Sequence, residues 1–251
     1  MTSITRAIVL SAGQGKRLLP LTESRPKCLI DLSGRSVLAW QLLHLAKAGV
    51  REAVVVTGFG AALVEGEIAR LTLPDMQVRT VFNPFYGVAD NLASCWIVRE
   101  AFDGGTLLLN GDTLFEPEIA QKLLGAPEAD ITVTIDRKAS YDADDMKVAT
   151  AGHALTAIGK TLATYDAESI GFLRFSARGA QRFRARTEAC MRDPVNLKRF
   201  YLSVIDELAR EGGVAVQSIE GLDWGEMDFL KDVEANQRMT QSWLERARSA
   251  A

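Results

Sequence analysis

Cysteine and histidine are scarce in this chain of 251 residues, and their scarcity excludes two kinds of site. Cys28, Cys95 and Cys190 are odd in number and widely spaced, and His44 and His153 are the only histidines. Neither a disulfide framework nor a zinc site fits so few and such scattered ligands. We therefore expect three buried or incidental thiols.

A surplus of one charge and a long apolar run are also missing. The 29 basic and 32 acidic residues leave a net charge of -3, so no basic field points to a nucleic-acid partner. The apolar run at residues 7–10 is too short for a signal peptide, and no stretch approaches the roughly 18 apolar residues of a membrane span. We expect a cytoplasmic protein without a membrane span or a nucleic-acid partner. The sequence leaves the oligomeric state open, a homodimer included.

Short β-branched runs alternate with segments of helical period in the first half of the chain. They predict strands over residues 7–11, 53–57, 78–82, 106–109 and 131–135, and helices over residues 37–48, 61–71, 91–102 and 118–124. This alternation is typical of parallel strands joined by right-handed crossovers, with helices on both faces of the sheet. Ligands of such sheets bind beyond the carboxyl ends of the strands.

After about residue 136 the rhythm changes. Strands are predicted over residues 146–150, 154–159, 170–175 and 214–219, and helices over residues 177–189, 197–210 and from 229 onward, with fraying over 246–251. The expected fold is α/β: one domain with a mostly parallel, mixed central sheet flanked by helices. A small extension from the second half would build the other wall of a cleft.

A glycine-rich turn follows the first predicted strand, at residues 10–18. Its two glycines let backbone amides point toward an anion without a side chain in the way. The dinucleotide fingerprint fails, because Leu18 stands at the third glycine position. The P-loop also fails, because Leu10 replaces its first glycine and Arg17 stands where Ser or Thr is required.

The longer pattern around this turn matches a different group of proteins. It resembles the nucleotidyltransferases of the sugar-phosphate pyrophosphorylase superfamily, with Gly13-x-Gly15-x-Arg17-Leu18-x-Pro20-Leu21-Thr22, then Pro26-Lys27 and Gly34. The resemblance implies a Rossmann-like nucleotidyltransferase fold and a Mg2+ cofactor. It divides the chain into a nucleotide-binding half, residues 1–136, and an acceptor-binding half with the C-terminal helix, residues 137–251.

The same resemblance implies roles for individual residues. Arg17 would meet the departing pyrophosphate, and Lys27 would bridge the α-phosphate and the attacking oxygen. An ionised phosphate that attacks phosphorus needs no general base, so cations rather than a proton acceptor are required. The full nucleotide-binding set is Leu10, Ala12, Gly13, Gly15, Lys16, Arg17, Lys27, Asn91, Ser94 and Gly111.

Two acidic residues are candidates for the metal ion. Asp112 follows Gly111 at the end of an apolar strand, where the phosphates are expected, and we predict that it is both a catalytic residue and a metal ligand. Mg2+ usually takes one or two carboxylates together with phosphate oxygens, and Asp228, in a late acidic motif, is the second candidate. The alternatives are a turn former for Asp112 and a helix N-cap for Asp228.

The segment at residues 83–94 departs from sugar-1-phosphate enzymes, which generally carry a Gly-Thr-Ala type sequence there. Its Asn83, Tyr86, Asn91 and Ser94 look like the cytidylyltransferases that activate phosphocholine and related phosphorylated alcohols or phosphonates. This implies transfer of CMP from CTP to an acceptor such as phosphocholine or 2-aminoethylphosphonate, with release of pyrophosphate. A sugar-1-phosphate nucleotidyltransferase using UTP, GTP, dTTP or CTP is the alternative.

Acceptor binding is the least specified part of the site. Lys147 and Lys160 either engage phosphate oxygens or are surface lysines at a strand edge, and an amine-bearing acceptor would require aromatic faces and acids. The predicted set is Tyr86, Lys147, Lys160, Glu168, Gly171, Trp224 and Glu226. A catalytically silent subunit and an unrelated α/β binding domain are the non-enzymatic alternatives. The four charged residues kept at positions 17, 27, 112 and 228 argue against a silent subunit.

Overall fold

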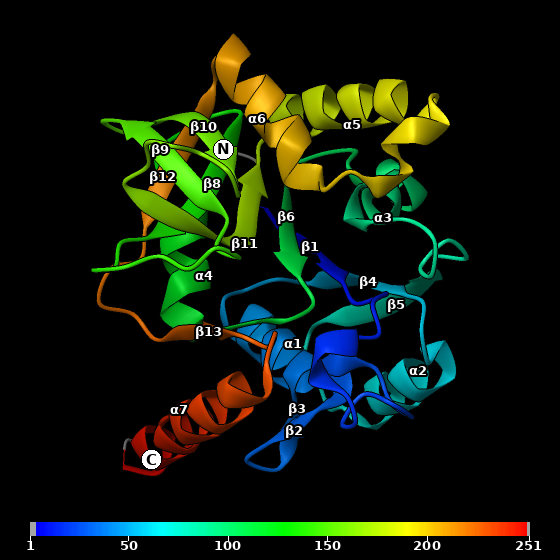
Figure 1. Ribbon diagram of the computed structural model, residues 1–251. Helices are drawn as coiled ribbons and strands as arrows, with labels where there is room; N and C mark the ends of the chain where they lie inside the picture. The colour runs from blue at the N-terminus through cyan, green and yellow to red at the C-terminus, as the bar shows by residue number, and fades with distance from the viewer. Residues whose placement is uncertain (1–3, 250–251) are drawn as a thin grey trace.

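A nine-stranded sheet runs through the centre of the protein in the computed structural model, which describes residues 4–249 (Figure 1). Its strands in chain order are β1 (Arg6–Leu10), β4 (Glu52–Thr57), β5 (Gln77–Phe82), β6 (Thr106–Asn110), β8 (Ile131–Asp136), β9 (Lys147–Ala151), β10 (Ala154–Gly159), β11 (Ala167–Phe175) and β12 (Val214–Ser218). In space they follow the order β5-β4-β1-β6-β11-β8-β12-β10-β9. Only β11 and β10 run against the other strands of this described sheet.

Helices cover both faces of the sheet, because apolar side chains leave the strands on both sides. Ala7 and Val9 pack on one face, against α1 (Val37–Lys47), α2 (Ala61–Arg70) and α4 (Pro117–Leu124). Ile8 points to the opposite face and packs toward α3 (Asn91–Ile97), α5 (Ala177–Met191) and α6 (Tyr201–Glu211). The alternation of side chains along a strand therefore builds two separate hydrophobic layers.

The strand register brings the functional turns together. β1 pairs in parallel with β4 and β6, and Leu10 lies opposite both Val56 and Asn110, so these strands end at one level. The Gly111 amide donates to the Leu10 carbonyl at 3.0 Å. A Cβ atom at Gly111 would lie 2.4 Å from that carbonyl oxygen, so the close approach of the two turns requires glycine.

A small two-stranded sheet carries the C-terminal part of the chain back to the end of β6. β7 (Thr113–Phe115) pairs antiparallel with β13 (Trp224–Glu226), and α7 (Leu230–Ser249) follows. The helix α7 packs by Trp243 on Trp40, in a third apolar cluster that also contains Leu18. A hairpin of β2 (Asp31–Leu32) and β3 (Arg35–Ser36) lies beside it.

The predicted elements are largely confirmed, but several ends differ, and the strand expected over residues 170–175 begins at Ala167. The helix expected over residues 91–102 ends at Ile97 and continues as the 3-10 turn η3 (Arg99–Ala101). The helix expected from residue 197 begins at Tyr201, after the 3-10 turn η4 (Pro194–Lys198). The expected fraying is wrong for residues 246–249, because α7 continues to Ser249 and Arg246 pairs with Asp223 at 2.7 Å. Residues 250–251 of that prediction lie outside the described part.

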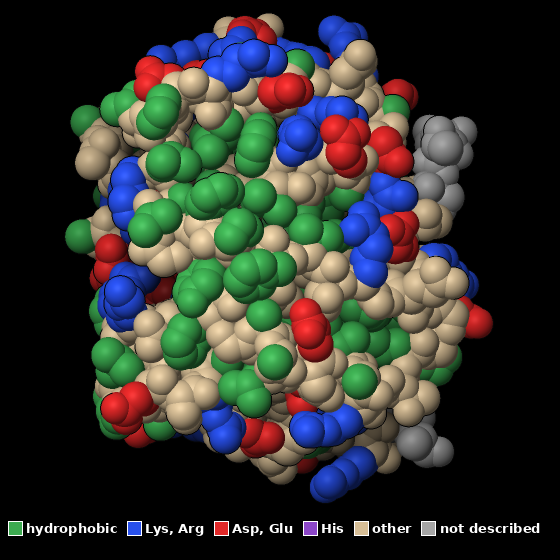
Figure 2. Space-filling model, turned by 90° about the vertical axis from the view of Figure 1, so that its right-hand side faces the viewer, with side chains coloured by type: hydrophobic (Ala, Val, Ile, Leu, Met, Phe, Trp, Pro, Cys, Tyr) green, Lys and Arg blue, Asp and Glu red, His purple; other side chains and the backbone are tan. Residues whose placement is uncertain are grey.

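The surface and the thiols agree with the composition. On the face shown in Figure 2, Lys and Arg side chains alternate with Asp and Glu around a band of hydrophobic side chains, and neither charge forms a field. Cys28 and Cys95 are buried and Cys190 is partly buried, and all three are free. Among the described helices, none is both long and apolar enough to cross a membrane.

Candidate active site

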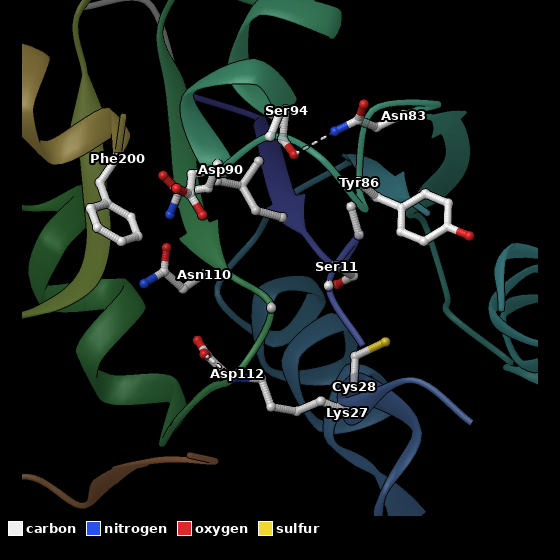
Figure 3. A pocket seen from close by; sticks show the side chains of 16 residues that line it. Ser11, Lys27, Cys28, Asn83, Tyr86, Asp90, Ser94, Asn110, Asp112 and Phe200 are labelled. Atoms are coloured by element: carbon white, nitrogen blue, oxygen red, sulfur yellow. Dashed lines mark hydrogen bonds and ion pairs between the residues drawn. The ribbon is translucent and has the colours of Figure 1, made fainter. Parts of the chain in front are cut away.

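A pocket of about 320 Å3 opens at the carboxyl ends of β1 and β6 (Figure 3). The turn after β1 forms one wall, and Tyr86 and Phe200 lie on opposite sides of the space. Most of the predicted nucleotide-binding residues line it, namely Leu10, Ala12, Gly13, Lys27, Asn91, Ser94 and Gly111. The other three, Gly15, Lys16 and Arg17, lie further along the turn, outside the lining.

The glycine-rich turn is held in shape by its own sequence. Thr22 donates through Oγ1 to the Gly15 carbonyl at 2.8 Å, and the Lys27 amide donates to the Gln14 carbonyl at 3.2 Å. Gly15 has a φ of 80°, in the left-handed region, and a Cβ atom there would lie 2.7 Å from the Lys27 Cβ. This glycine therefore permits the close packing that places Lys27 at the pocket.

Lys27 joins the two acidic residues that the sequence predicted for the metal ion. Its Nζ lies 2.5 Å from Asp112 Oδ2 and 3.0 Å from Asp228 Oδ1. Burial alone would lower the pKa of Lys27, but the charges of Asp112 and Asp228 outweigh it and hold that pKa above its ordinary value. Burial would raise the pKa of Asp228, and Lys27 and Arg17 reverse that effect and lower it. Lys27 and Asp228 are thus charged at neutral pH.

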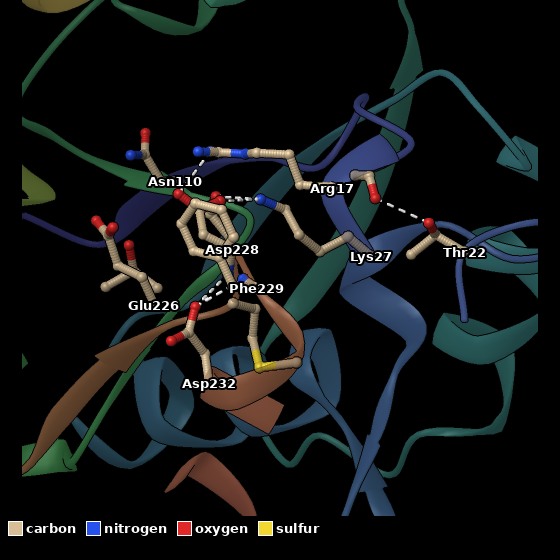
Figure 4. A network of polar contacts seen from close by, with 12 residues as sticks. Arg17, Thr22, Lys27, Asn110, Glu226, Asp228, Phe229 and Asp232 are labelled. Atoms are coloured by element: carbon tan, nitrogen blue, oxygen red, sulfur yellow. Dashed lines mark hydrogen bonds and ion pairs between the residues drawn. The ribbon is translucent and has the colours of Figure 1, made fainter. Parts of the chain in front are cut away.

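The structure also separates two possible roles of Asp228 (Figure 4). Asp232 Oδ2 accepts hydrogen bonds from the Asp228 amide at 3.0 Å and the Phe229 amide at 2.7 Å, so Asp232 supplies the cap at the start of α7. The Asp228 side chain is free for the site, where it also accepts from Arg17 at 2.7 Å. The N-cap alternative for Asp228 is therefore wrong. Arg17 in turn stacks over the Phe229 ring, 4.8 Å from its centroid.

The predicted acceptor-binding residues divide into two groups by position. Glu226 lies beside Asp228, and burial, followed by the charges of Asp112 and Asp228, raises the pKa of its carboxyl. Lys160 also reaches the site: its Nζ lies 3.5 Å from Asp144 and 5.8 Å from the centroid of the Phe200 ring that lines the pocket. Lys160 is therefore more than a surface lysine at a strand edge.

The other members of that set make different contacts. Lys147 is buried, and its Nζ donates to the carbonyls of Asp142 at 2.8 Å and Lys160 at 3.3 Å, so it ties a loop together and is not a surface lysine. Tyr86 lines the same pocket as the predicted nucleotide-binding residues, on the side opposite Phe200. Its predicted contact with the acceptor stays a prediction.

Trp224 and Gly171 support neighbouring residues. The indole of Trp224 donates to Asp136 Oδ2 at 2.8 Å. Gly171, with a φ of 70°, packs on the Asn110 side chain, where a Cβ atom would lie 2.2 Å from the amide nitrogen. Glu168, the last of the set, pairs with Lys138 at 2.8 Å near the start of β11.

Several residues around the site were missed by the sequence reasoning. Asn110 lines the pocket, and its buried Oδ1 has no hydrogen-bond partner among residues 4–249. The signal for Asn110 was its place directly before the Gly-Asp pair at the end of β6. Asp144 contacts Arg17 at 3.2 Å as well as Lys160, and Lys138 contacts Glu168. Both come from the irregular loop between β8 and β9, and the sequence reasoning assigned neither of them a role.

Asn83 and Asn91 fix the segment around α3. Asn83 donates through Nδ2 to Ser94 Oγ at 3.0 Å, which ties the start of this segment to the helix. Asn91 accepts through Oδ1 from the Tyr201 amide at 2.9 Å and so joins α3 to the beginning of α6. The wall of the pocket opposite Lys27 is therefore a braced structure rather than a free loop.

The geometry fits a site for a triphosphate, and comparison with known proteins agrees with it. A model of the MobA-like NTP transferase domain matches residues 7–216. The chain belongs to this family. The predicted membership of the nucleotidyltransferases, and the α/β fold with its mixed sheet, are thereby confirmed.

Individual relatives are similar over different lengths. The chain is 42% identical over 124 residues to CMP-5'-(3-aminopropyl)phosphonate synthase of Streptomyces rubellomurinus, a match that covers 49% of this chain and 20% of that relative. It is 24% identical over 254 residues to the CTP:phosphoglutamine cytidylyltransferase of Campylobacter jejuni, covering 91% of this chain and 97% of that one. The structure of the inositol-1-phosphate CTP transferase from T. maritima superposes with a TM-score of 0.80 at 21% identity, over 94% and 96% of the two chains.

Proposed function

We propose that the chain transfers CMP from CTP to a small phosphonate or phosphorylated alcohol, such as 2-aminoethylphosphonate or phosphocholine, and releases pyrophosphate. The cluster at Lys27 carries this proposal: its ammonium lies 2.5 Å from Asp112 and 3.0 Å from Asp228, at a pocket beside a glycine-rich turn. Charged groups fixed in this way suit the binding of phosphates. Relatives whose names contain CMP or CTP support the choice of nucleotide.

In the proposed reaction, an oxygen of the acceptor phosphate or phosphonate attacks the α-phosphorus of CTP. The bond between that phosphorus and the oxygen of the leaving pyrophosphate breaks. The attacking oxygen is already ionised, so the main barrier is the approach of two anions and the spread of negative charge. Lys27 would stand between the α-phosphate and the attacking oxygen, and Arg17 would bind the pyrophosphate.

Asp112 and Asp228 would hold the Mg2+ ion of this reaction. Their carboxylate oxygens fit the ion. Asp112 Oδ1 is buried without a hydrogen-bond partner among residues 4–249, and both carboxylates accept a hydrogen bond from Lys27, so they lie close together. Residues 4–249 contain no cluster of three or more His, Cys, Asp or Glu side chains arranged for a metal, so phosphate oxygens and water would complete the coordination. When bound, the ion would orient both phosphates and neutralise their charge.

The two halves of the chain would divide the substrates between them. Residues 1–136 supply the turn, Lys27 and Asp112, and would bind the nucleotide. Residues 137–251 supply Lys160 and Glu168, and would bind the acceptor. The braced segment around Asn83 and Ser94, 3.0 Å apart, would form the far wall of the nucleotide site.

A matrix of substrates tests the proposal. Pyrophosphate release, coupled to pyrophosphatase, would be measured for CTP, UTP, GTP and dTTP against 2-aminoethylphosphonate, phosphocholine and glucose 1-phosphate, with Mg2+. We expect the highest rate for CTP with a phosphonate or a phosphorylated alcohol. Turnover confined to the sugar phosphate would replace this function by that of a sugar-1-phosphate nucleotidyltransferase. The absence of pyrophosphate release from every pair of substrates would contradict nucleotidyl transfer itself.

A further inference from the structure

The loop between β8 and β9 holds a lysine ammonium between two carboxylates and an aromatic ring. Lys138 Nζ lies 2.8 Å from Glu168 Oε1 and 3.0 Å from Asp145 Oδ2. It also lies 5.7 Å from the centroid of the Tyr141 ring. Carboxylates and the face of an aromatic ring are the partners that organic ammonium groups prefer. These four residues thus form an ammonium site that the chain itself occupies.

The buried carboxylate of this site, Glu168, is paired with a partly exposed lysine side chain. Glu168 is 3% exposed, and among residues 4–249 its carboxylate forms an ion pair only with Lys138, which balances its charge. The Lys138 side chain is 37% exposed. A buried carboxylate is stable when further hydrogen bonds satisfy it. Here a long and partly exposed lysine supplies the compensation alone, as a replaceable ligand would.

The site has more negative than positive charge. The carboxylates of Glu168 and Asp145 both face the single ammonium of Lys138. The region around Glu168 and Asp145 is therefore acidic, and cations lie near it. A ligand with opposite charges at its two ends fits this distribution better than the phosphate ester of an uncharged alcohol does.

Two of the cations near the site contact the residue directly before Asp145. Asp144, directly before Asp145, contacts Arg17 at 3.2 Å and Lys160 at 3.5 Å. One carboxylate of the pair therefore contacts the two cations, and the next contacts the ammonium of Lys138.

We propose that Glu168 and Asp145, with the ring of Tyr141, bind the ammonium group of the acceptor, and that Lys138 fills this subsite until the acceptor displaces it. The inference rests on the proposed function and narrows the acceptor to the aminoalkyl phosphonates and phosphates. No covalent bond changes in this step. One ammonium replaces another between the same carboxylates, and the displaced lysine moves into solvent.

Calorimetric binding of two matched compounds tests this subsite without any turnover. 2-Aminoethylphosphonate and ethylphosphonate, which lacks the amine, would be titrated into the wild-type protein with Mg2+ present. We expect the amine compound to bind at least about tenfold more tightly, the effect of one charged hydrogen bond. Glu168→Gln is expected to abolish that preference and to leave the affinity for ethylphosphonate unchanged.

Removal of the internal competitor gives a second, opposite signal. Lys138→Met is expected to tighten binding of the amine compound several-fold and to leave ethylphosphonate unchanged, whereas Lys122→Met, at an exposed lysine on α4, changes neither. A lysine that merely held the loop in place would weaken binding of both compounds when replaced.

Equal affinity of the wild type for the two compounds, the absence of binding included, would overturn the inference, as would equal weakening of both in Glu168→Gln. Asp145→Asn provides the same comparison if thermal melting shows that Glu168→Gln does not fold. The proposed nucleotidyl transfer fails by a different result, namely no pyrophosphate release from any pair of substrates.

Discussion

Lys27 Nζ lies 2.5 Å from Asp112 Oδ2, although 85 positions separate the two residues in the chain. Asp112 is placed by the end of β6, and Lys27 by the short turn η2 (Lys27–Leu29), which packs on α1. The pair therefore exists only when the sheet and its first helix have formed. Its charges are held in position before any ligand arrives, which is the condition for strong electrostatic stabilisation of a transition state.

Lys27→Met is expected to lower kcat by about 10²–10³-fold, the effect of removing one fixed charged donor from a transition state. It also removes the ammonium between Asp112 and Asp228 and leaves Arg17 as the remaining cation on Asp228, so the melting temperature is expected to fall. Steady-state kinetics and thermal melting would be measured beside Lys27→Arg, which keeps the charge, and Lys122→Met at the surface. Activity of Lys27→Met within tenfold of the wild type contradicts the assigned role.

Asp112→Asn and Asp228→Asn are each expected to abolish Mg2+-dependent turnover while the fold remains intact. An amide is a weaker ligand than a carboxylate for a hard cation such as Mg2+. The measurement is the rate as a function of Mg2+ concentration, with circular dichroism as the check on folding. Asp75→Asn is the matched control, because the Asp75 side chain is 80% exposed and pairs only with Arg51 among the described residues. Retained activity in both site variants excludes them as the metal ligands.

The strands and helices were predictable because their signals are local. Runs of β-branched residues and helical periodicity lie within a few residues of one another, and they placed β1, β4 and β6 to within one residue at each end. The position of β12 beside β8 was not predictable in this way. That parallel pair joins Val214 to Ile131, and only the packing of the whole sheet selects it.

The candidate site shows the same division. Lys27 and Asp112 belong to sequence motifs, one at the turn η2 and one after the end of β6, where the fold itself fixes the position of a side chain. Tyr86 and Lys147 carried suitable chemistry, but the packing of the folded chain decides where such side chains lie, and it placed Tyr86 in the pocket lining and buried Lys147. Lys138 could not be predicted for the same reason, because it lies in the loop after β8 and its partner Glu168 lies on β11.

Gly13→Ala is expected to raise the KM for CTP about tenfold and to leave the melting temperature unchanged. A Cβ atom at Gly13 meets nothing within 4 Å in the protein, and the residue lines the pocket, so the methyl group would occupy nucleotide space. Gly111→Ala is the contrasting variant. Its Cβ atom would lie 2.4 Å from the Leu10 carbonyl oxygen, and it is expected to destabilise the protein by about 1–3 kcal/mol. An unchanged KM in Gly13→Ala removes this turn from the nucleotide site.

Asp232→Ala tests whether the cap of α7 positions Asp228. The Asp232 carboxylate accepts from two backbone amides, those of Asp228 and Phe229, and its loss is expected to cost about 1 kcal/mol of stability. A mispositioned Asp228 predicts a lower kcat together with a higher requirement for Mg2+. Asp232→Asn keeps the accepting oxygen and is expected to restore most of both. A drop in stability without a change in the Mg2+ requirement limits Asp232 to a structural role.

The affinity for an amine-bearing acceptor is expected to increase with pH. Burial raises the pKa of Glu168 to about 7, against the lowering effect of Lys138, so the carboxyl is protonated below that pH and charged above it. An ammonium group binds the charged form, and its affinity should therefore fall about tenfold per unit as the pH drops well below 7. The charged groups around Glu168 are of three kinds. Lys138 and Asp145 belong to the same ion-pair cluster, and Asp136 and Lys147 lie opposite Glu168 on neighbouring strands. Glu226 is coupled to Glu168 electrostatically.

The ratio of the affinities for 2-aminoethylphosphonate and ethylphosphonate would be measured from pH 6 to 8.5 in the wild type and in Glu168→Gln. Ionisation of the two compounds themselves contributes equally with both proteins, and the amide of the variant does not ionise, so the variant supplies the baseline. Divided by that baseline, the wild-type ratio is expected to rise with pH and to level off above about pH 8. A ratio that rises equally in that variant assigns the titration to another of these groups and removes Glu168 from the ammonium site.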